Sequence, residues 1–104
     1  MNERGGEGFL GMLDKRDQDA VLRTLVPQSW ASYLVPIDYV AADITVPKIY
    51  ILTTEDVAFP MMFQKMWSAA SGCETVEIKS DHSPFFADDR AKLVVDVIEK
   101  AAKA

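Results

Sequence analysis

The chain has 104 residues, a length that fits one small folded domain. Hydrophobic residues make up 49% and charged residues 26%, so the composition is that of a globular protein and excludes a disordered chain. Lys and Arg number 11 against 16 Asp and Glu, which gives a net charge of −5. We therefore expect no nucleic acid and no anionic membrane as a partner, because both attract clustered positive charge.

Hydropathy and cysteine content limit the location of the protein. No apolar run reaches the roughly 18 residues of a membrane-spanning helix. The single Cys73 cannot form an internal disulfide, which agrees with a reducing, cytoplasmic location. We expect this thiol to be structural or inert, and we expect no cofactor and no metal ion.

The first half of the chain has an irregular pattern. Residues 1–12 are rich in Gly, contain no apolar signal core and predict a flexible leader. A helix is predicted from about Lys15 to Val26, with Asp14 as its N-cap and Pro27 ending it. Its apolar face is formed by Ala20, Val21, Leu22 and Leu25. Residues 27–46 have no clean period and predict a short helical turn with an extended connection.

From residue 47 onward the pattern is regular. Residues 48–53 are β-prone throughout, which is typical of a strand covered on both faces. A helix is predicted to begin near Pro60 and to end at Gly72, a typical C′ residue. A second strand is predicted over 75–79. Apolar residues at helical spacing predict that this helix packs into a core, although Met61, Met62, Met66 and Trp67 could instead line a substrate pocket. The apolar residues are Met61, Met62, Phe63, Met66, Trp67 and Ala70.

A final helix is predicted over residues 88–102, with an apolar stripe of Val94, Val97, Ile98 and Ala101. The aromatic pair Phe85 and Phe86 precedes it, and we expect this pair to anchor the preceding loop against the core. The order strand, helix, strand, helix predicts an α/β fold with two parallel strands.

This topology brings two titratable residues to one edge of the sheet. Asp56 follows the first predicted strand, and the only histidine, His82, follows the second. The carboxyl ends of parallel strands lie along one edge, where ligands bind. An aspartate there can hold one imidazole nitrogen, so that the other can take a proton from a serine or cysteine. The neighbouring Glu55 remains an alternative acid, and Asp81 is interpreted as a turn former.

The order and spacing of these short motifs resemble the C-terminal part of α/β-hydrolase-fold enzymes, with the nearest likeness to the plant and fungal esterase and hydroxynitrile-lyase-like branch. The motifs are residues 47–56 (PKIYILTTED), Pro60, Gln64 and residues 80–85 (SDHSPF). Such proteins carry a similar strand ending in the triad Asp, a helix with a Pro near its start and a Gln within it, and a His-Ser-Pro loop. The resemblance covers about residues 27–102.

The resemblance implies that Asp56 is the triad acid and His82 the triad base. It also implies a partial α/β-hydrolase fold, in which residues 47–104 form the C-terminal βαβα unit. Residues 13–46 would be the end of the cap region, with a cap-derived helix, and the connection to the sheet. Family members are considerably longer than this chain.

The nucleophile that the family requires is missing from the sequence. None of the serines lies in a Gly-x-Ser-x-Gly elbow, and the oxyanion segment rich in His and Gly is also absent. We therefore expect an ester-hydrolase-like fragment that is inactive alone, whose parent acts on a small apolar or ester-type substrate. Esterase, lyase and secondary-metabolism chemistry remain open for that parent. The alternatives are a non-catalytic remnant that binds a small molecule or partner, and docking or self-association through the open sheet edge.

Overall fold

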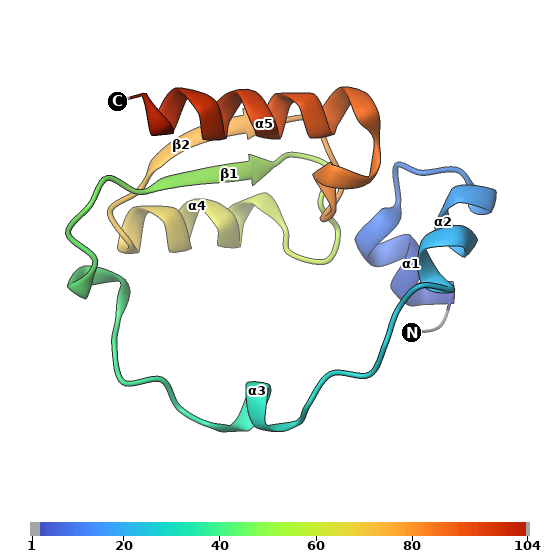
Figure 1. The fold of residues 1–104 in the computed structure, drawn as a ribbon, viewed down its shortest axis with the longest axis horizontal. Helices are drawn as coiled ribbons and strands as arrows, with labels where there is room; N and C mark the ends of the chain where they lie inside the picture. Colours follow the sequence, from blue (N-terminus) through green and yellow to red (C-terminus); the bar gives the residue numbers. More distant parts are fainter. Residues whose placement is uncertain (1–2, 104) are drawn as a thin grey trace.

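The computed structural model describes residues 3–103, which form a mixed α/β arrangement (Figure 1). Five helices and one two-stranded parallel sheet lie within this described part. The elements are α1 (Glu3–Leu10), α2 (Lys15–Leu22), α3 (Ala31–Leu34), β1 (Ile49–Thr53), α4 (Met61–Ala70), β2 (Glu74–Ile78) and α5 (Asp88–Ala102), with short 3₁₀ turns at Ala41–Asp43 and Pro84–Phe86. The predicted order of strand, helix, strand and helix is confirmed.

The sheet lies between two helices. The strands pair in parallel from Ile49 opposite Glu74 to Thr53 opposite Ile78. The crossover helix α4 packs against β1, and α5 packs against β2 on the opposite face (Figure 1). Because the strands are parallel, both loops that follow them emerge at the same edge of the sheet.

Local sequence signals correctly predicted the start of α2 and the end of α4. The Asp14 carboxylate accepts the Asp17 N–H at 2.8 Å and begins α2. Gly72 follows α4 with a φ of +67°, a left-handed conformation that favours glycine. The predicted extension of α2 to Val26 is wrong, because α2 ends at Leu22. There the Thr24 N–H and hydroxyl both donate to the Val21 carbonyl, which tightens the chain into a turn.

Within residues 1–12, which the sequence predicts as a flexible leader, Glu3–Leu10 form the helix α1. Residues 1 and 2 lie outside the described residues. Gly6 is buried, and a Cβ there would lie 3.1 Å from Gln18 Oε1 and 3.2 Å from Leu22 Cδ1. The glycine therefore allows α1 and α2 to approach closely, and Leu10 is buried with 3% exposure.

The connection from α2 to β1 runs as a wide arc away from the sheet (Figure 1). It contains the short helix α3, as predicted, and the 3₁₀ turn at Ala41–Asp43 before β1. Its large apolar side chains are mostly uncovered, with Val26 exposed at 82% and Trp30 at 77%. This segment therefore adds little buried apolar surface to the fold.

The predicted apolar core is only partly formed. Met62 is 70% exposed and Trp67 is 56% exposed, and Phe85 and Phe86 are also exposed, so their assignment to core packing is wrong. On α5, Val94 and Val97 are half-buried while Ile98 is exposed. Two strands present only a narrow strip to each helix, so side chains beside that strip stay uncovered. The buried apolar side chains in the described part are Leu10, Leu52 and Ile78.

Candidate active site at the carboxyl ends of the strands

The two residues singled out by the sequence meet in space. Asp56 lies three residues beyond β1, and His82 lies four residues beyond β2, at the same edge of the sheet. The His82 Nδ1 lies 2.8 Å from the Asp56 Oδ2. The Asp56 side chain is 3% exposed and the His82 side chain 41% exposed. The expected contact is confirmed, whereas the catalytic role of the pair stays a prediction.

Both carboxylate oxygens of Asp56 are held by residues at the end of β1 and in the loop that follows it. The Oδ1 atom accepts the Ala58 N–H at 2.9 Å and the Phe59 N–H at 2.8 Å. The Oδ2 atom accepts the Thr53 hydroxyl at 2.9 Å, in addition to facing His82. These bonds fix the carboxylate in one orientation, so that one oxygen is presented to the imidazole.

Gln64 on α4 supports this loop from behind. It is almost fully buried; its Oε1 accepts the Thr53 N–H at 2.8 Å, and its Nε2 donates to the Thr53 and Phe59 carbonyls at 2.9 and 2.7 Å. Gln64 thereby pairs backbone groups that would otherwise be buried and unsatisfied. The sequence signal for this role was a polar residue among the apolar positions of the helix, and only the family resemblance pointed to it.

The loop after β2 is fixed in a similar way. The buried Asp81 accepts the Ser83 N–H at 3.0 Å and the Ser80 hydroxyl at 3.3 Å with its Oδ1. This agrees with its interpretation as a turn former. Its Oδ2 accepts the Met12 N–H at 3.0 Å, a bond to the N-terminal helices that the sequence did not predict.

Glu55 contributes to the site through its backbone. Its N–H donates to the Ser80 carbonyl at 2.9 Å and joins the two strand-end loops. Its side chain is exposed, and the carboxylate at His82 belongs to Asp56. The alternative acid is therefore not the residue that the fold places against the histidine.

A hollow of about 230 Å³ opens beside the pair. Its lining combines residues of β1, the two strand-end loops and α4: Tyr50, Ile51, Thr53, Asp56, Phe59, Gln64, His82 and Pro84. Burial raises the pKa of the Tyr50 hydroxyl above its usual range, and the nearby charges of Asp56 and Cys73 act in the same direction. The hollow thus lies directly beside the Asp56 and His82 side chains.

The arrangement can move a proton at one ring nitrogen. A carboxylate that accepts hydrogen bonds can pair with Nδ1 only if Nδ1 carries the proton, so a neutral His82 has its lone pair on Nε2. No serine hydroxyl or cysteine thiol in residues 3–103 forms a hydrogen bond with His82. Cys73 precedes β2 and is separated from the histidine loop by the full length of that strand. Neither does this part of the chain bring three metal-ligating side chains together.

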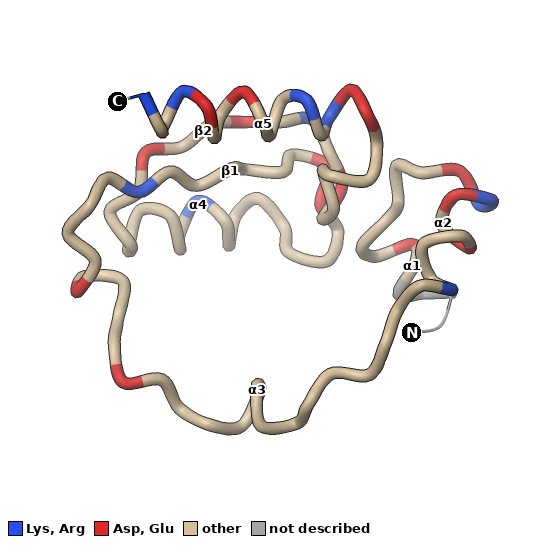
Figure 2. Tube along the Cα trace, viewed as in Figure 1, with Lys and Arg blue, Asp and Glu red and all other residues tan. Residues whose placement is uncertain are grey.

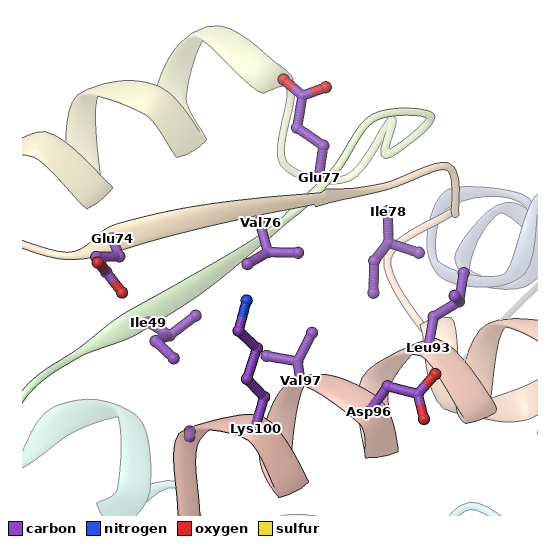
Figure 3. Close-up of a pocket in the computed structure, with 10 residues that line it drawn as sticks. Ile49, Glu74, Val76, Glu77, Ile78, Leu93, Asp96, Val97 and Lys100 are labelled. Carbon is purple, nitrogen blue, oxygen red and sulfur yellow. The ribbon is translucent and has the colours of Figure 1, made fainter. Parts of the chain in front are cut away.

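A second hollow, of about 360 Å³, lies between the sheet and α5 (Figure 3). Its walls are mainly apolar, with Ile49 and Val76 from the strands facing Val97 from α5. Figure 3 shows the Lys100 side chain reaching from α5 toward the strands, whereas the Glu77 carboxylate points away on the other face of the sheet. Basic and acidic residues are interspersed along α5 (Figure 2).

Comparisons with known proteins give no relatives. No protein family, curated protein or solved structure matches the chain. Within residues 3–103, no helix has the length and hydropathy needed to cross a membrane. Functional inference therefore depends on the residues of the site themselves.

Proposed function

We propose that this chain is the C-terminal part of an α/β-hydrolase-fold protein that performs ester hydrolysis or a related reaction of the Ser-His-Asp type. His82 would act as general base, and Asp56 would orient it and stabilise the imidazolium. The substrate would be a small molecule with an apolar or ester group. The nucleophile would come from a segment outside residues 1–104.

One observation carries this proposal. The Asp56 carboxylate and the His82 imidazole are 26 residues apart in sequence, yet their Oδ2 and Nδ1 atoms are separated by only 2.8 Å. The acid is buried and the base is accessible, which is the distribution of roles that a triad needs. A surface histidine with an incidental ion pair would not require a carboxylate anchored by three further hydrogen bonds.

The coding sequence upstream of Met1 offers a direct test. The proposal expects a reading frame with a Gly-x-Ser-x-Gly elbow there, or on a separate chain that associates with this one. A genome that contains neither arrangement would contradict it. The isolated chain should not hydrolyse a fluorogenic ester; if it does, and the His82→Ala variant is equally fast, the assignment of His82 is wrong.

Kinetics of a chain extended to include the elbow would test the roles of the two residues. Asp56→Asn should lower kcat by about 10⁴-fold, because the amide favours the wrong tautomer of the imidazole. Glu55→Gln is the matched control, since Glu55 joins the loops through its backbone alone. An Asp56→Asn enzyme as active as the Glu55→Gln enzyme would contradict the role of Asp56.

The hollow between the sheet and α5 favours a second candidate function, a non-catalytic module that binds a small apolar molecule or a partner. Its apolar walls and single inward-reaching cation are separate from the acid–base pair. Because Glu74 and Asp96 line the hollow together with Lys100, a neutral apolar probe such as 1-octanol is suitable. Stabilisation by 1-octanol that survives His82→Ala but is lost in Val97→Asp would favour this function over hydrolysis.

A further inference from the structure

The N-terminal helices reach the candidate active site through Phe9. The Phe9 and His82 rings lie with their centroids 4.9 Å apart and their planes at 71°, an edge-to-face geometry that is favourable for aromatic rings. Phe9 is the penultimate residue of α1, in the region predicted as a leader. A segment with no predicted role thus contacts the imidazole that the proposed chemistry uses.

A hydrogen bond holds this segment in place. The Met12 N–H, just after α1, donates to the buried Asp81 Oδ2 at 3.0 Å. The same carboxylate accepts the Ser83 N–H with its other oxygen, so Asp81 bonds on both sides of the histidine loop and to the turn after α1. Since Asp81 directly precedes His82, the two contacts lie at neighbouring positions.

The packing around Phe9 is otherwise loose. A hollow of about 160 Å³ lies between α1, α2 and the histidine loop, lined by Phe9, Leu10, Val21, Leu22, Leu25, Ser83 and Phe86. Close packing there is incomplete, because the neighbouring Leu25 and Phe86 are 46% and 44% exposed. The ring of His82 and the bond at Asp81 are the specific contacts in this interface.

We infer that Phe9 is a positioning residue for His82 and that Asp81 fastens α1 so that Phe9 stays against the imidazole. Asp56 holds the Nδ1 atom, and the Phe9 ring limits rotation of the imidazole about its Cβ–Cγ bond. The contact leaves Nε2 without a hydrogen bond in the described part of the chain. The inference builds on the proposed role of His82 as base, yet the contact itself can be tested without any turnover.

The single histidine makes the test specific, because one set of imidazole signals appears in the NMR spectrum of the full chain. In the unmodified protein, the Hδ2 and Hε1 shifts should be displaced by the ring current of Phe9. Phe9→Leu should remove most of that displacement, and Phe9→Tyr should retain it. Phe86→Leu is the matched control, because Phe86 lines the same hollow while its ring contact is with Phe85.

Asp81→Asn tests the fastening. The amide offers one carbonyl oxygen in place of two carboxylate oxygens, so it cannot accept both the Met12 and the Ser83 N–H as the carboxylate does. Hydrogen exchange at the Met12 amide should become faster, and the ring-current displacement at His82 should fall with it.

Two results would overturn the inference. One is a Phe9→Leu spectrum in which the His82 signals are unchanged. The other is a Phe86→Leu spectrum in which they move as far as in Phe9→Leu. A His82 that keeps its bond to Asp56 in either case would leave the proposed hydrolase role standing, so the two failures can be told apart.

Discussion

The two strand-end loops and the connection over residues 24–46 are opposite in character. In the loops and on the face of α4 that supports them, the most deeply buried side chains are polar, and Asp81 and Ser80 of the second loop and Gln64 of α4 all take part in hydrogen bonds within the chain. In the connection the large side chains are apolar, and most of them face solvent. The polar structure around the site is therefore complete, whereas the apolar surfaces lack covering partners. This difference agrees with the proposal that the site is built locally, whereas the core would be completed by other segments.

The largest effect should come from breaking the buried polar network. Gln64→Leu leaves the Thr53 N–H and the Phe59 carbonyl without partners and leaves the Thr53 carbonyl with only the 3.4 Å bond from the Asp56 N–H, which should cost about 3 kcal/mol. Urea denaturation measures this cost. Gln28→Leu, in the exposed connection, is the matched control and should change stability by less than about 0.5 kcal/mol. Equal effects at the two positions would erase the distinction between the regions.

Arg90 on α5 is an exception to the pattern that buried polar groups form hydrogen bonds. Its side chain is buried, and its Nε and Nη2 atoms have no hydrogen-bond partner among the described residues. Two buried guanidinium nitrogens without partners are costly, so Arg90→Met should raise the free energy of unfolding by about 1 kcal/mol. Urea denaturation measures the change, and Arg23→Met at the exposed end of α2 is the control. A clear loss of stability in Arg90→Met would contradict the absence of a partner.

The raised pKa of Tyr50 predicts a smaller effect on stability, and this effect depends on pH. Burial and the charge of Asp56 raise its pKa in the folded chain, so the unfolded chain ionises first, near its ordinary pKa of 10.0. The stability due to neutral Tyr50 is present below that pH and is lost as pH rises through the folded pKa. Tyr50→Phe should therefore lose less stability under alkaline conditions than the unmodified chain. Tyr39→Phe in the exposed connection should behave like the unmodified chain, and an identical alkaline loss in Tyr50→Phe would contradict the raised pKa.

The connection should contribute to association more than to stability. Trp30→Ser should change the unfolding free energy by less than about 0.5 kcal/mol, because the side chain is already exposed.

We expect the unmodified chain to be poorly soluble, dimeric or partly molten, since β1 and β2 form a sheet with open edges. Sedimentation at several concentrations tests this expectation. A monomer with a sharp thermal transition independent of concentration would contradict it.

The elements from residue 47 onward were predicted well, because the sequence signals for them are local. The β-prone run before Thr54, the C′ glycine at Gly72 and the spacing of α5 each act over a few residues. The meeting of Asp56 and His82 followed from parallel topology alone, which places both strand ends on one edge.

The remaining features depend on long-range contacts that periodicity does not contain. Gly6 looked like a flexible residue, yet it lies where a Cβ would press closely on the Gln18 and Leu22 side chains of α2. The Met12–Asp81 bond joins residues 69 positions apart, and no local pattern marks it. Apolar spacing on α4 predicted a core, but spacing does not reveal whether a neighbour is present to cover Met62 or Trp67.

The tautomer of His82 tests the central claim most directly. Nitrogen-15 NMR of the single histidine distinguishes a proton on Nδ1 from one on Nε2. The Nδ1–Oδ2 contact of 2.8 Å predicts that the neutral imidazole carries its proton on Nδ1, and that Asp56→Ala abolishes this preference. A proton on Nε2 in the unmodified chain, unchanged in Asp56→Ala, would contradict the acid–base pair.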